Sequence, residues 1–187
     1  MTGNKSDNPN IMKESEKITL IIDIIKRYDN YIVSTNTKAS LLIAINSLIL
    51  GTVLLKFSEI LSFYCSPTIK GVVGFLLVII SASSLLSLFF VFIVVYPYFR
   101  SKENNKKQQG SLIYFGSVSE MSGQEYFNNL NSVTIEGLIA DLSQQATILA
   151  GILKKKMLLM RHGIETIMVS VSLAMALVII KAAMFFW

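Results

Sequence analysis

The fold is decided by GVVGFLLVIISASSLLSLFFVFIVVYP, residues 71–97, which contains no Asp, Glu, Lys or Arg. A helix needs roughly 20 apolar residues to cross the hydrocarbon core of a bilayer, which is about 30 Å thick. Two further apolar stretches, Ala39–Phe57 and Thr166–Trp187, are also long enough. The sequence therefore predicts an all-α membrane protein with three transmembrane helices.

The pieces outside these three spans are too short to form a large soluble catalytic domain. We expect the N-terminal helix and the segment between the second and third spans to form a small cytosolic helical bundle. In chain order, we predict a disordered tail at 1–10, an amphipathic cytosolic helix at 11–38, the first span at 39–57, an outer loop at 58–70, the second span at 71–97, a cytosolic helical segment at 98–165 and the third span at 166–187.

The distribution of basic residues predicts how the chain is oriented in the membrane. Lysines and arginines are frequent before the first span and between the second and third spans, whereas the loop 58–70 holds only Lys70. Cytosolic loops of membrane proteins carry an excess of Lys and Arg. We therefore expect the N-terminus and the central segment in the cytosol, and the loop 58–70 and the C-terminus outside.

Two segments have apolar residues at helical spacing. Apolar residues recur at three- and four-residue steps from Ile18 to Ile32, and again from Ile135 to Met160. This spacing is typical of one face of a helix, and the second stripe is narrow enough for a helix–helix seam. The stripe packs either on the first helix or on a second subunit. Residues 34–37, STNT, either continue the first helix or interrupt it, because Thr and Asn favour caps.

Polar residues within and beside the spans have two interpretations each. Asn46, Ser81 and Ser84 either join helices by hydrogen bonds or line a pore in an oligomer. The cluster Lys154–Lys156 with Arg161 either anchors the chain to anionic head groups or forms an anion site. One histidine, His162, and one cysteine, Cys65, are too few for a usual metal site. The sequence therefore predicts no metal, no cofactor and no enzymatic activity.

Four motifs, in their order relative to the spans, resemble one protein family. They are Ser34–Leu42 before the first span, Tyr114-Phe115-Gly116 after the second, the pair Glu125-Tyr126, and the helix Asp141–Lys156 before the third. Over residues 17–175 the chain resembles the Pycsar transmembrane effectors, bacterial antiphage proteins paired with a pyrimidine nucleotide cyclase. One departure is Asn36, which stands where the family pattern usually has aspartate, so a charged pair of relatives would be weaker or absent here.

The resemblance implies that the chain binds a cyclic pyrimidine mononucleotide, cyclic UMP or cyclic CMP, made by the partner cyclase. It further implies a homo-oligomer that impairs the bacterial inner membrane, with no nucleic acid as partner. A ring to stack on the base and a cation for the phosphate are then needed. The candidates are Tyr114, Phe115 and Tyr126 for the base and Lys38, Lys154 and Arg161 for the phosphate. Core packing is the alternative role for the three aromatic residues.

Other functions compatible with the sequence differ in what triggers the protein. A toxin or holin-like pore would answer to a partner protein. A CBASS-like effector would answer to a cyclic oligonucleotide and would need a larger basic surface for its additional phosphates. A small transporter subunit is disfavoured by the long hydrophilic segment before the last span and by the lack of ionisable residues at mid-membrane.

Overall fold

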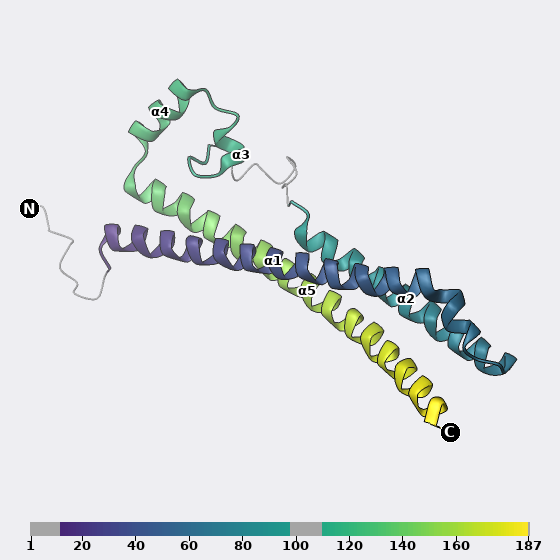
Figure 1. Ribbon diagram of the computed structural model, residues 1–187. Helices are drawn as coiled ribbons and strands as arrows, with labels where there is room; N and C mark the ends of the chain where they lie inside the picture. Colours follow the sequence, from purple (N-terminus) through teal and green to yellow (C-terminus); the bar gives the residue numbers. More distant parts are fainter. Residues whose placement is uncertain (1–11, 98–109, 187) are drawn as a thin grey trace, which may run out of the picture. The chain divides into compact units, whose positions relative to one another are not determined.

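The computed structural model describes residues 12–97 and 110–186, and every regular element within them is a helix. The order is α1 (Glu14–Ser62), α2 (Pro67–Val95), α3 (Phe115–Val118), α4 (Gly123–Ser132) and α5 (Ile135–Phe186), as drawn in Figure 1. The predicted tail 1–10, the stretch 98–109 and Trp187 lie outside the described residues.

Three of these helices are long and apolar enough to cross a membrane. They are α1, α2 and the part of α5 up to Ala183. The prediction of an all-α chain with three apolar helices is confirmed, whereas the cytosolic bundle and the domain boundaries stay predictions.

Helix α1 is 49 residues long and passes through the STNT stretch without a break. The Thr37 hydroxyl donates to the carbonyl of Val33 at 3.0 Å, and Ser40 donates to Asn36 at 3.1 Å. Hydroxyls that bond back to the preceding turn often bend a helix, but here the helix continues. The predicted amphipathic helix and the first apolar span are therefore one helix of about 70 Å at 1.5 Å per residue.

The remaining helix ends follow ordinary capping chemistry. Helix α2 begins with Pro67 in its first turn after Ser66, where the missing N–H of proline costs nothing. Helix α4 begins with a capping box, in which Ser122 and Glu125 each bond the backbone of the other. At the start of α5 the Thr134 hydroxyl accepts from the N–H of Gly137 at 3.1 Å. Within residues 111–134 of the predicted helical segment 98–165, the structure has the two short helices α3 and α4.

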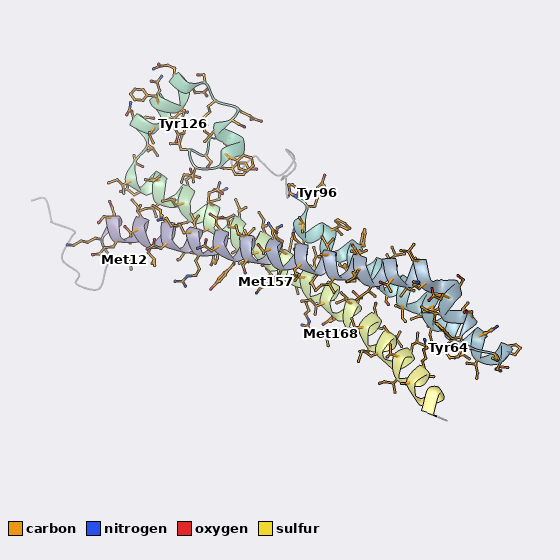
Figure 2. The ribbon with its side chains drawn as sticks, viewed as in Figure 1. Met12, Tyr64, Tyr96, Tyr126, Met157 and Met168 are labelled. Atoms are coloured by element: carbon orange, nitrogen blue, oxygen red, sulfur yellow. The ribbon has the colours of Figure 1, made fainter. Side chains whose placement is uncertain are left out.

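The chain divides into two compact units. Unit 1 is Met1–Tyr31 with Tyr98–Leu153, and unit 2 is Ile32–Pro97 with Lys154–Trp187. In unit 2, one apolar cluster gathers at the connection between α1 and α2, where Figure 2 shows Tyr64; its buried members are Val53, Tyr64, Val73, Leu77, Ile80 and Leu177. A second cluster comprises Ala39, Val91, Val94 and Met160.

The outer faces of the unit 2 helices are apolar rather than polar. Leu55 is 84% exposed, Leu48 is 72% exposed and Phe75 is 67% exposed. Exposed apolar side chains in such numbers are unfavourable in water and mark an interaction surface. Lipid is the natural cover for helices of this length and composition.

Candidate functional site

A cavity of about 340 Å³ lies in unit 1, and we call it the aromatic pocket. Its walls come from α1, from residues 113–115 at the start of α3, and from α5. The lining residues are Ile25, Asp29, Ile113, Tyr114, Phe115, Gln145, Ile148, Leu149 and Ile152. The volume is at the lower end of the range for small-molecule sites, about 300–1,000 Å³.

The aromatic wall of this pocket is held in place by Asp141 on α5. Its carboxylate accepts from the Ser111 hydroxyl at 2.7 Å and from the Leu112 N–H at 2.9 Å. The Ser111 oxygen in turn accepts from the N–H of Tyr114 at 3.0 Å. Hydrogen bonds to a charged carboxylate are stronger than those between neutral groups. The backbone that carries the pocket's two aromatic rings is therefore fixed to α5.

The two rings, those of Tyr114 and Phe115, lie side by side in the pocket wall. Their centroids are 5.0 Å apart and their planes are tilted by 53°. The Phe115 side chain is 65% exposed. At Gly116 an added Cβ would lie 2.5 Å from Cε1 of Tyr114. Only glycine therefore leaves room for the Tyr114 ring in this position.

Tyr126, the third aromatic candidate, lies on α4 (Figure 2) and contacts the segment that carries Tyr114 and Phe115. Its hydroxyl donates to the carbonyl of Leu112 at 3.2 Å. Tyr126 is not among the residues that line the aromatic pocket. The structure thus places Tyr114 and Phe115 together at the pocket, and Tyr126 behind the segment that carries them.

Gln145 is the unexpected member of the pocket lining. The residue is only 7% exposed, and its Nε2 is buried without a hydrogen-bond partner. A buried donor left unpaired costs about 1–3 kcal/mol. Sequence reasoning missed Gln145 because the sequence alone does not show which glutamine of the helix is buried.

Two of the predicted phosphate ligands line a different cavity, in unit 2. Lys38 on α1 and Arg161 on α5 border a space of about 330 Å³, which we call the basic pocket. The Nε of Arg161 donates to Oε1 of Glu165 at 2.7 Å, and this hydrogen bond lowers the pKa of the Glu165 carboxyl. Lys154 is exposed on α5 and borders neither pocket.

Lys156, close in sequence to Lys154, is buried with 8% of its surface exposed. Its Nζ donates to Oδ1 of Asn36 at 3.0 Å and also to the carbonyl of Val94. One cation of α5 thereby joins α1 and the end of α2, and its burial lowers the pKa of Lys156. The signal in the sequence is its spacing from Leu153 and Met160, which are both buried on the same face.

A buried line of polar side chains, the polar seam, connects α1, α2 and α5 within unit 2. Asn46 Nδ2 donates to the carbonyl of Ser84 at 3.0 Å. The Ser84 hydroxyl donates to Ser170 at 3.3 Å, and the Ser83 and Ser170 hydroxyls lie 2.7 Å apart. Asn46 Oδ1 is buried without a partner.

Ser81, the third polar residue singled out from the spans, bonds within its own helix. Its hydroxyl donates to the carbonyl of Leu77 at 2.9 Å. Farther along α2, Ser87 donates to the Gly163 carbonyl of α5 at 2.7 Å. Asn46 and Ser84 are thus contacts between helices, whereas Ser81 is not.

The residue types that usually bind metals are scattered over residues 12–97 and 110–186. No group of three His, Cys, Asp or Glu side chains there is close enough to hold a metal. Cys65 is an exposed free thiol. His162 lies 3.2 Å from Glu165 and packs against Phe90, with ring centroids 5.8 Å apart.

Comparison with known proteins gives two consistent matches. A family model described as Pycsar effector protein domain matches residues 20–183. The chain is 30% identical over 175 residues to the Pycsar effector protein EcPycTM of Escherichia coli. The aligned residues cover 91% of this chain and 94% of that protein. No solved structure matches the chain.

Proposed function

The chain belongs to the family of Pycsar effector proteins, and we propose that it is a receptor and membrane effector in one molecule. It binds cyclic UMP or cyclic CMP made by a partner pyrimidine nucleotide cyclase. The bound protein then assembles into an oligomer and impairs the bacterial inner membrane. Growth arrest or cell death follows without any covalent chemistry by this chain.

The observation that carries the proposal is the continuity of α1 and α5. Helix α1 contributes residues up to Tyr31 to unit 1 and residues from Ile32 to unit 2, and α5 likewise passes from unit 1 to unit 2 at Leu153–Lys154. A helix is stiff. A ligand that moves α1 against α5 in unit 1 therefore also shifts α1 against α5 in unit 2. Sensing and membrane action then share two uninterrupted elements.

The orientation follows from the charges beside the spans. Basic residues of α5, Lys154, Lys155 and Arg161, precede the third predicted span, whereas the predicted outer loop 58–70 has only Lys70. The excess of positive charge belongs on the cytosolic side. Unit 1 then faces the cytosol, where a cyclase would release its product, and the C-terminus lies outside.

The polar seam is the element we propose to change during activation. Within a single chain, the hydroxyls of Ser83, Ser84 and Ser170 bond one another and the Asn46 Nδ2 donates to the Ser84 carbonyl, whereas Asn46 Oδ1 has no partner. In an oligomer the same groups can pair between copies and bring polar faces together across the bilayer. A ligand drives this only if it binds the assembled arrangement more tightly than the resting one.

Calorimetry on the full-length protein in detergent tests the receptor role. The titrants are cyclic UMP, cyclic CMP, cyclic AMP and cyclic GMP. We expect saturable binding of a pyrimidine nucleotide and at least ten-fold weaker binding of both purine nucleotides. Absence of binding to all four would contradict the proposal and favour a trigger by a partner protein or by a cyclic oligonucleotide.

A further inference from the structure

The aromatic pocket combines a flat apolar wall with one unpaired donor and one acceptor, and this arrangement points to a nucleobase. We propose that Gln145 and Asp29 read the edge of a pyrimidine ring that stacks on Tyr114 or Phe115. The inference rests on the proposed function, because it names the place where the cyclic nucleotide binds. Gln145 and Asp29 were not among the residues suggested by the sequence.

The unpaired Gln145 amide is the first step of the argument. Buried side-chain donors in folded proteins are almost always paired. Gln145 Nε2 has no partner, although the residue is more than nine-tenths buried and borders the cavity. A ligand carbonyl entering the pocket supplies the missing acceptor. Uracil and cytosine both have such a carbonyl at C2.

The second step is the acceptor on the opposite helix. Asp29 of α1 borders the same cavity, and an ionised carboxylate can only accept hydrogen bonds. Uracil offers N3–H and cytosine offers its N4 amino group as donors. The same negative charge repels the phosphate, so the base, rather than the phosphate, is placed next to α1.

The third step is the ring surface. Phe115 lines the pocket while 65% of its surface remains exposed, so a stacked base would cover apolar surface that is now uncovered. The two ring planes are tilted by 53°, so a flat base can lie parallel to one of the two rings while the other ring is inclined to it. Offset stacking of this kind is favourable for aromatic groups.

The fourth step concerns charge. None of the nine residues that line the pocket is Lys or Arg. Recognition through the base therefore dominates recognition through the phosphate. Two consequences follow: affinity for the cyclic pyrimidine nucleotide changes little with salt, and the corresponding nucleoside without phosphate competes for the site.

The decisive variant is Gln145→Leu, with Gln124→Leu as its matched control. Gln124 lies on α4, where its amide donates to the exposed Asn128 side chain at 3.2 Å. The measurements are calorimetric affinity for the tighter-binding pyrimidine nucleotide and the thermal midpoint without ligand. We expect Gln145→Leu to weaken binding at least ten-fold with an equal or higher midpoint. Gln124→Leu should bind like the wild type.

The paired readout separates a ligand contact from a structural role. A residue needed only for folding would lose affinity and thermal midpoint together, and that result would overturn the assignment. Unchanged affinity in Gln145→Leu and in Asp29→Asn would overturn it as well. In that case binding by the wild type would leave the proposed function standing at another site.

A measurement on the unaltered protein guards against a variant that does not fold. Amide hydrogen exchange is followed with and without saturating cyclic UMP or cyclic CMP. We expect slower exchange in residues 111–118 and in the part of α5 around Gln145. Slower exchange elsewhere, with none in these two segments, would place the nucleotide outside the aromatic pocket. No binding to any cyclic nucleotide would overturn this inference and the proposed function together.

Discussion

Gly163 lies where α5 packs on α2 with no room for a side chain, and replacing it by alanine probes this packing. A Cβ added at Gly163 would lie 2.5 Å from Cγ2 of Val91 and 3.7 Å from the carbonyl oxygen of Ser87. Carbon atoms in favourable contact are about 3.5–4.0 Å apart. The alanine methyl therefore overlaps the Val91 side chain by about 1 Å or more.

The change in the free energy of unfolding combines two costs and one gain. Val91 is buried, with 1% of its surface exposed, and overpacking of a filled core costs about 1–3 kcal/mol. Displacement of α5 also weakens the hydrogen bond from Ser87 to the Gly163 carbonyl, worth about 1 kcal/mol. Alanine in place of glycine within a helix returns about 1 kcal/mol. We expect Gly163→Ala to lower the free energy of unfolding by about 1–3 kcal/mol.

Gly151 provides the matched control in the same helix. An added Cβ there meets nothing within 4 Å, so Gly151→Ala should be neutral or stabilising by up to about 1 kcal/mol. The assay is denaturant unfolding in detergent micelles, followed by circular dichroism. Adding Val91→Ala removes the clashing methyl groups, so the double variant should be less destabilised than the sum of its parts. Equal shifts of the two glycine variants, or purely additive behaviour with Val91→Ala, would refute the packing argument.

Three further predictions concern the anchor of the aromatic wall, the buried lysine and the orientation of the chain. Asp141→Ala removes the acceptor that holds segment 110–114. Amide hydrogen exchange in that segment should become faster, by a factor that corresponds to a loss of about 1.5–3 kcal/mol in the free energy of local opening. Unchanged exchange would contradict this role of Asp141. Asn36→Asp supplies a carboxylate to Lys156 Nζ, 3.0 Å from Asn36 Oδ1, and should raise both the pKa of Lys156 and the thermal midpoint by strengthening that bond; a lower midpoint would count against it. Cys65 should react with a membrane-impermeant maleimide in intact spheroplasts, because it is exposed and the distribution of basic residues predicts that its loop lies outside; labelling only after permeabilisation would reverse the predicted topology.

The spans could be predicted from sequence because hydropathy alone determines them. Residues 71–97 contain no charged side chain, and the structure places a helix over nearly all of this stretch, to Val95. Helix boundaries were harder to predict from the sequence, since they depend on local hydrogen bonds. The hydroxyl of Thr37 bonds back to the preceding turn, so α1 continues where the sequence left a break open.

Residues of the sites were predictable only in part. The pair Tyr114 and Phe115 has a visible signal, because it belongs to the Tyr114-Phe115-Gly116 motif of the family resemblance. Gln145 has no such signal. It stands out because its Nε2 is buried without a hydrogen-bond partner, and only the packing of the folded chain creates that situation. Lys156 differs from the exposed Lys154 only in the helix face on which it lies. A helical projection shows that face, but it does not show that the carbonyl of Val94 accepts a hydrogen bond from Lys156.

The most direct test of ligand-triggered membrane impairment is dye release from liposomes that contain the full-length protein. Cyclic UMP and cyclic CMP are added separately, with cyclic AMP and cyclic GMP as controls and protein-free liposomes as the blank. The account predicts release that follows the affinity for the pyrimidine nucleotide and is reduced in Gln145→Leu. Release that is already complete without nucleotide, or tight pyrimidine binding without any release, would contradict it.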